Sequence, residues 1–176
     1  TNLPMMFYFG GWRTGLSGAP SVAASFKNFT RRYAELKAQY PHLPATPFGV
    51  FVGDEPDLAR HPERQQQLHD GLALVKVTFP DAITYLNMLY ASIGCPGPNP
   101  GWPFLCNSST WSGDPEQLAK ALGKRQLDWL STDEYYDVSV AHYQEVYRSR
   151  LYPHLRPDQR IILLPFAAFC EIGCQA

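Results

Sequence analysis

The sequence has no long apolar run and no marked excess of charge of either sign. No apolar stretch approaches the roughly 20 residues that a helix needs to cross a bilayer, so we expect no membrane span. The formal net charge is −1 with histidine neutral, and the sequence contains no cluster of basic residues of the kind that forms a nucleic-acid-binding surface. Neither nucleic acid nor membrane is therefore an expected partner.

The motifs that bind phosphate groups or metal ions are also missing. Gly10 and Gly11 do not open a dinucleotide-binding loop, and the sequence has no other Gly-rich phosphate loop. The five histidines fall in expected helices or in the turns beside them, away from strand ends: His42, His61, His69, His142 and His154. We expect no cofactor, no metal site and no histidine-based triad.

Cysteine is scarce, and the four that occur form two close pairs. Cys95 and Cys106 would close a loop rich in Pro and Gly, whereas Cys170 and Cys174 would close a tight turn. Four cysteines allow three connectivities, and four unpaired thiols are the alternative. The spacings fit zinc ligation poorly. We favour two disulfides, which indicate an oxidising, extracellular compartment.

Two N-x-[ST] sequons point weakly to the same compartment. The sequon at Asn107 lies in a Ser/Gly/Pro-rich loop where a glycan could be reached, whereas the sequon at Asn28 lies inside an expected helix. The chain begins with Thr1 instead of Met, so we expect that a segment was removed upstream. Together these features predict a secreted glycoprotein.

The order of the segments is a strand followed by a helix four times, and then a fifth strand. The apolar strand-like segments span 3–12, 48–53, 82–90, 127–131 and 160–166, and the helix-like segments span 21–40, 64–79, 114–123 and 139–155. In the first helix apolar residues recur every three or four positions, Ser21 is a plausible N-cap and Pro41 ends the pattern. Such alternation predicts one α/β domain over residues 1–176, with a parallel sheet.

Two architectures fit five such strands. One is an open doubly wound sheet, which five strands can complete. The other is part of an eight-stranded (β/α) TIM barrel, which needs about 250 residues when complete. Length alone favours the open sheet, but the distribution of polar residues favours the barrel.

Carboxylate and aromatic side chains gather after the carboxyl ends of the strands, where both architectures place their sites. In strand order they are Trp12 and Arg13; Asp54 and Glu55; Asn87 and Tyr90; Asp133, Glu134, Tyr135 and Tyr136; and Glu171. Glycosidic bond cleavage needs two carboxylates, and aromatic rings hold sugar faces. This pattern favours chemistry on a carbohydrate, although Asp133 could instead start a helix and the two tyrosines could serve packing.

Four segments resemble strands of glycoside-hydrolase-like TIM barrels. The segment F-G-V-F-V-G-D-E-P (48–56) resembles their fourth strand, and residues 75–87 resemble the helix and strand that follow. L-D-W-L-S-T-D-E-Y-Y-D (127–137) is similar to the sixth strand and R-I-I-L-L-P-F (160–166) to the seventh. The resemblance implies that the chain spans strands three to seven. Because a partial barrel has two open edges, we expect a fragment of a larger chain or assembly.

The resemblance also implies roles for individual residues. In the retaining glycosidase clan the acid/base Glu ends strand four and the nucleophile Glu ends strand seven, which implies Glu55 as acid/base and Glu171 as nucleophile. Asp54 stands where this clan usually has Asn, and Asp133 or Glu134 is an alternative second carboxylate. We therefore expect a glycoside hydrolase, with a non-catalytic extracellular glycan-binding or structural module of the same ancestry as the alternative.

Overall fold

The computed structural model describes residues 6–9, 21–54, 62–89, 126–133, 141, 144–145 and 147–162, and the structural statements below concern these residues. In chain order the elements are β1 (Met6–Tyr8), α1 (Val22–Gln39), β2 (Gly49–Asp54), α2 (Pro62–Thr78), β3 (Ile83–Leu89), β4 (Trp129–Asp133), the π-helical turn η1 (Tyr147–Leu151), the 3-10 turn η2 (Tyr152–His154) and β5 (Arg160–Ile162).

The five strands form one sheet in which every neighbouring pair is parallel. Their order across the sheet is β1-β2-β3-β4-β5, the same as their order in the chain. This confirms the predicted α/β class with five parallel strands and intervening helices. A doubly wound sheet reverses its strand order at a switch point, and these five strands show no reversal. Closure into a barrel stays a prediction.

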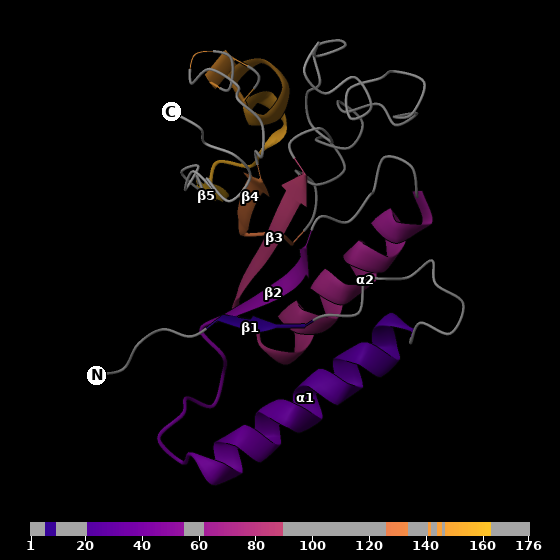
Figure 1. Cartoon of the computed structure of the whole chain (residues 1–176), viewed down its shortest axis with the longest axis vertical. Helices are drawn as coiled ribbons and strands as arrows, with labels where there is room; N and C mark the ends of the chain where they lie inside the picture. The colour runs from indigo at the N-terminus through magenta and orange to yellow at the C-terminus, as the bar shows by residue number, and fades with distance from the viewer. Residues whose placement is uncertain are drawn as a thin grey trace, which may run out of the picture.

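Both helices α1 and α2 pack on the same face of the sheet (Figure 1). Because successive strand residues point to opposite faces, one alternating set from each strand reaches these helices. That set supplies much of the core, together with Leu68, Leu72 and Val75 of α2: Phe9, Val50, Val52, Leu86, Met88 and Leu130. The opposite face of the sheet is thus made by the remaining alternating set.

Helix α1 begins and packs as its sequence predicts. The Ser21 backbone is extended, and its hydroxyl accepts a hydrogen bond from the Ala24 N–H at 3.2 Å, which is the geometry of an N-cap. Phe26, Phe29 and Tyr33 are the large buried side chains of the helix. Aromatic contacts join α1 to β1, because Phe9 lies edge-on to Phe26 at a centroid distance of 5.4 Å.

The predicted α-helix over 139–155 is wrong at its carboxyl end. Residues 141 and 144–145 are helical, but the chain then widens into η1 and tightens into η2. Pro153 lies in the first turn of η2, and proline cannot supply the N–H that a continuing α-helix needs. Tyr147 and Leu151, two residues of the predicted apolar face, are nevertheless buried in the core.

Hydrogen bonds lock the amino-terminal ends of β3 and β4 together. The Asp128 carboxylate accepts from the Thr84 N–H at 2.8 Å and from the Lys76 ammonium of α2 at 2.6 Å. Lys76 also donates to the carbonyl of Ala82 at 2.8 Å, and the Thr84 hydroxyl donates to the carbonyl of Gln126 at 2.7 Å. We call the side chains of Lys76, Asp128 and Thr84 the amino-end clamp. It lies at the end of the sheet that in α/β barrels serves stability.

Candidate functional site

The sheet face opposite α1 and α2 carries a row of aromatic rings, which we call the aromatic face. Tyr8, Phe51 and Tyr85 follow one another across β1, β2 and β3 in strand register. Ring centroids are 5.2 Å apart for Tyr8 and Phe51, and 4.9 Å apart for Phe51 and Tyr85, which are stacked. Trp129 of β4 is the register partner of Tyr85 and meets Phe48 edge-on. These rings offer the flat apolar surfaces that sugar C–H groups pack on.

Toward the carboxyl ends of the strands the same face becomes polar. Asn87 of β3 and Ser131 of β4 are register partners, and both are buried. The Ser131 hydroxyl donates to the Asn87 side-chain oxygen at 2.6 Å. Because its single hydrogen is used there, the 2.5 Å contact between the Tyr85 and Ser131 hydroxyls has Tyr85 as donor. We call Tyr85, Ser131 and Asn87 the polar triad.

The polar triad fixes the orientation of the Asn87 amide. Its oxygen faces Ser131 on the β4 side, so its NH₂ group, with two donor hydrogens, is directed away from Ser131. Buried polar groups adopt one arrangement when every member of a network is bonded. The polar triad therefore holds the Asn87 amide in one orientation next to a row of aromatic rings.

A β-bulge in β2 decides which residue lies beside Asn87. Phe51 pairs with Tyr85, and the register then shifts so that Gly53 pairs with Leu86 and Asp54 pairs with Asn87. Without the extra residue, Gly53 would occupy the position beside Asn87. Bulges often adjust the end of a strand near a functional site. Here the bulge brings the first carboxylate residue of the Asp-Glu-Pro segment into register with the polar triad.

Three predicted site residues thus lie on adjacent strands. Asp54 ends β2 and pairs with Asn87 of β3, and Asp133 ends β4 and pairs with Leu89, two residues past Asn87. Neighbouring strands are about 4.8 Å apart, so the backbones of Asp54 and Asn87 are adjacent, whereas Asp133 lies one strand further across the sheet and two residues further along. Asp133 is the last residue of β4, and its alternative role at the start of the following helix stays a prediction.

The other predicted site residues lie outside the described residues: Trp12, Arg13, Glu55, Tyr90, Glu134, Tyr135, Tyr136 and Glu171. Asn107 and all four cysteines lie outside them too. In the chain, Glu55 directly follows Asp54, Tyr90 follows Leu89 and Glu134 follows Asp133. Their roles, the disulfides and the glycan at Asn107 stay predictions.

Sequence reasoning missed two members of the polar triad. Ser131 was predicted only as a strand end and Tyr85 only as part of a strand. The period of two along a strand places Tyr85 on the same face as Asn87, and this signal was available. Ser131 could not be found in the same way, because its place beside Asn87 depends on the register between β3 and β4.

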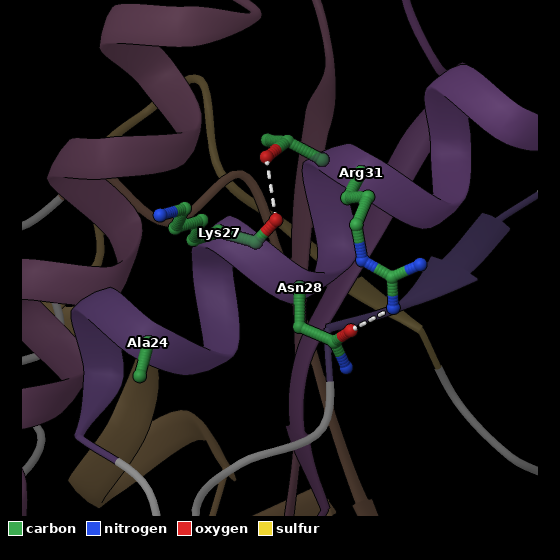
Figure 2. Close-up of a pocket in the computed structure, with 5 residues that line it drawn as sticks. Ala24, Lys27, Asn28 and Arg31 are labelled. Carbon is green, nitrogen blue, oxygen red and sulfur yellow. Dashed lines mark hydrogen bonds between the residues drawn. The ribbon is translucent and has the colours of Figure 1, made fainter.

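A surface hollow lies along α1 (Figure 2). It measures about 550 Å³ and is lined by Ala24, Lys27, Asn28, Thr30 and Arg31. Its polar groups pair with one another: Arg31 donates to the Asn28 side-chain oxygen at 2.7 Å, and the Thr30 hydroxyl donates to the Lys27 carbonyl at 3.0 Å. The hollow is the solvated side of a helix, and it places Asn28 of the first sequon on an exposed helical surface.

In the part of the chain that the structure describes, no group of three or more His, Cys, Asp or Glu side chains could hold a metal ion. Among the same residues, no helix is both long and apolar enough to span a bilayer.

Comparison with known proteins identifies no relative. Neither a protein-family model, nor a curated protein, nor a solved structure matches the chain.

Proposed function

We propose that the chain is part of a glycoside-hydrolase-like (β/α) barrel that binds a carbohydrate at the carboxyl ends of its strands and cleaves a glycosidic bond. The observation that carries the proposal is the arrangement of Asp54, Asn87 and Asp133. Asp54 and Asn87 are register partners, and Asp133 lies on the next strand two residues past the register partner of Asn87, on a sheet that also carries the aromatic face. The sequential strand order, with both helices on one face, supports the barrel.

In the proposed reaction Glu55 is the general acid, and it follows the strand end that the bulge sets beside Asn87. Glu55 gives its proton to the glycosidic oxygen as the bond to the anomeric carbon breaks. A second carboxylate from Glu171, Asp133 or Glu134 either attacks that carbon or takes a proton from the attacking water. In the first case Glu55 then takes a proton from water as the glycosyl–enzyme bond is hydrolysed.

The described residues supply binding and orientation. The side-chain oxygen of Asn87 is fixed by Ser131, so this amide keeps one orientation at the end of the strands where a sugar would bind. The rings of Phe51 and Tyr85 stack against an apolar sugar face. Trp12, Arg13, Tyr90, Tyr135 and Tyr136 complete the proposed carbohydrate-binding set.

Replacing Glu55 with Gln tests the reaction. Glu55→Gln keeps the size of the side chain but removes the transferable proton, so the release of reducing ends from a polysaccharide panel should fall by about 10²-fold or more. The matched control is Asp81→Asn, because Asp81 is an exposed carboxylate in the turn before β3, at the opposite end of the strand. It should keep the activity. Unchanged turnover in Glu55→Gln would show that the assignment is wrong.

A non-catalytic glycan-binding module is the second candidate. The observation that favours it is that the polar triad, which the structure describes in full, consists of an amide, a hydroxyl and a phenol beside stacked rings. These groups bind sugars without needing charge. Binding of a saccharide that Ser131→Ala weakens, with no reducing ends released by the wild-type chain, would support this module over the enzyme.

A further inference from the structure

The first sequon, Asn28-Phe29-Thr30, lies inside α1, and the function proposed above does not use it. Phe29 is buried in the core, whereas Asn28 is exposed and Thr30 is half-buried. The core contact of the middle residue fixes the rotation of the helix. It therefore leaves the asparagine of the sequon on the solvent side.

Asn28 belongs to an exposed stripe of α1. The stripe consists of exposed residues at spacings of four, three and four, which lie along one side of a helix: Ala24, Asn28, Arg31 and Glu35. We call this set the outward stripe. In a (β/α) barrel the helices form the outer ring, so this side of α1 faces solvent whether or not the sheet closes.

The orientation of the Asn28 amide is fixed by Arg31. The guanidinium donates to the Asn28 side-chain oxygen at 2.7 Å, and because arginine only donates, the atom facing it is the oxygen. Figure 2 shows the amide nitrogen directed away from Arg31. A surface hollow of about 550 Å³ lies beside the side chain. The atom that an N-linked glycan occupies thus belongs to an exposed side chain next to open space.

The polar side chains of the sequon form no hydrogen bond to another described element. Asn28 pairs with Arg31, and the Thr30 hydroxyl donates to the Lys27 carbonyl at 3.0 Å, so both bonds stay within α1. Asparagine and threonine are also weaker helix formers than alanine. Among the described residues, neither hydrogen bonding between elements nor helix propensity accounts for this pair.

We propose that Asn28 is the acceptor of an N-linked glycan, which covers the outward stripe of α1. The inference rests on the extracellular compartment expected from the sequence and not on the proposed catalysis. In the transfer, the amide nitrogen bonds to the anomeric carbon of a lipid-linked oligosaccharide diphosphate. The bond from that carbon to the diphosphate oxygen breaks, the lipid diphosphate leaves with the electron pair, and one amide proton passes to a base of the transferase.

The folded helix accommodates this glycan without rearrangement. Transfer takes place on the chain as it enters the secretory pathway, before α1 folds, so the folded structure decides only whether the glycan is tolerated. The linkage replaces one hydrogen of the amide and keeps its oxygen, so the bond from Arg31 can still form. Because the outward stripe lies outside the core between α1 and the sheet, the sugars meet solvent.

Secretion of the full chain from a eukaryotic cell line, with a signal peptide added, tests the proposal. Asn107→Gln leaves Asn28 in the only remaining sequon. The mass of this variant should fall when N-glycans are released enzymatically, and release in heavy-oxygen water should label position 28. In the same background Thr30→Ser keeps the sequon and should keep the glycan, whereas Thr30→Ala destroys the sequon and should lose it.

The two Thr30 variants are matched, because both change the same side chain and alanine is a good helix former. Secreted and cell-retained chains are both measured, so a variant that folds poorly still gives a result. Absence of a glycan from Asn107→Gln in both fractions would overturn the proposal, and so would a glycan that persists in Thr30→Ala. Glu55→Gln should keep the glycan at Asn28, so this result is distinguishable from failure of the proposed catalysis.

Discussion

Ser131 connects the two halves of the polar triad, because its hydroxyl accepts from Tyr85 and donates to Asn87. Both bonds are short, and the serine is fully buried between the strands. Ser131 therefore fixes the orientation of the larger Asn87 side chain. That orientation contributes to ligand binding only if the ligand contacts the Asn87 amide.

Ser131→Ala tests this dependence. The change leaves the Asn87 oxygen and the Tyr85 hydroxyl without their shared partner, which should destabilise the fold by about 1–3 kcal/mol in urea titration. The affinity for a saccharide ligand should fall as well, because Asn87 loses the contact that fixes its orientation. Tyr85→Phe is the control, because it keeps the bond between Ser131 and Asn87; its affinity should stay closer to wild type. Equal losses of affinity in both variants would contradict a specific role for Asn87.

Among the elements, the amino-end clamp is the strongest polar connection that the structure describes between α2, β3 and β4. The Asp128 carboxylate accepts from the Lys76 ammonium and from the Thr84 N–H, and its side chain is only 27% exposed. Charge-assisted hydrogen bonds in such a partly buried setting are worth more than those on an open surface. The clamp thus holds the sheet at the end opposite the proposed site.

Asp128→Ala should lower the free energy of unfolding by about 2–3 kcal/mol, because Thr84 and Lys76 lose charged partners. Asp128→Asn keeps an acceptor for the Thr84 N–H and should cost less. Asp81→Ala, which removes an exposed carboxylate without a described partner, should have little effect. Denaturant unfolding measures all three variants. A cost for Asp128→Ala no larger than for Asp81→Ala would show that the clamp does not stabilise the sheet.

Local sequence signals predicted most of the described elements. The cap at Ser21 and the spacing of Phe26, Phe29 and Tyr33 are both local, and α1 follows them within a residue or two. Departures occur where a single residue changes the backbone. A π-helical turn from Tyr147 and a 3-10 turn containing Pro153 replace the end of the predicted α-helix, and the bulge after Phe51 adds a residue to β2. The spacing of the apolar residues predicts neither the change of helix type nor the bulge, because the same apolar residues are buried with or without them.

At the scale of the whole molecule, the unfolding equilibrium should depend on alkaline pH through Tyr33. Burial raises the pKa of Tyr33 above its ordinary value, and its hydroxyl donates to the Pro44 carbonyl at 2.8 Å. The neutral phenol is therefore favoured in the folded state. Its contribution to stability is complete below a pH of about 10, the unfolded pKa, and is lost as pH rises through the higher folded value.

Tyr33→Phe should remove this contribution. At neutral pH the variant should be less stable by about 1 kcal/mol, because one hydrogen bond is lost. Above a pH of about 10 the difference in the free energy of unfolding between wild type and variant should shrink. In wild type the phenol then ionises in the unfolded state while it stays neutral in the folded state, which favours unfolding. Thermal unfolding across this range measures the difference. A constant difference at every pH would mean that the Tyr33 phenol titrates alike in the folded and unfolded states.

The candidate site was predictable in composition but not in geometry. The sequence places Asp54, Asn87 and Asp133 near strand ends, and parallel strands bring such ends to one edge. Which of them are neighbours depends on register, and register comes from pairing between segments far apart in the chain. Asp54 lies beside Asn87 because of the bulge, and Ser131 joins them through the pairing of β3 with β4.

The strand order has a consequence for how the chain is made. Each strand after β1 pairs with the one that precedes it in the chain, so its template already exists when it leaves the ribosome. Among the five described strands, none has to wait for a later one to be inserted between itself and its neighbour. Growth can then proceed from the amino terminus one strand at a time, which limits the exposure of unpaired β-strand during synthesis.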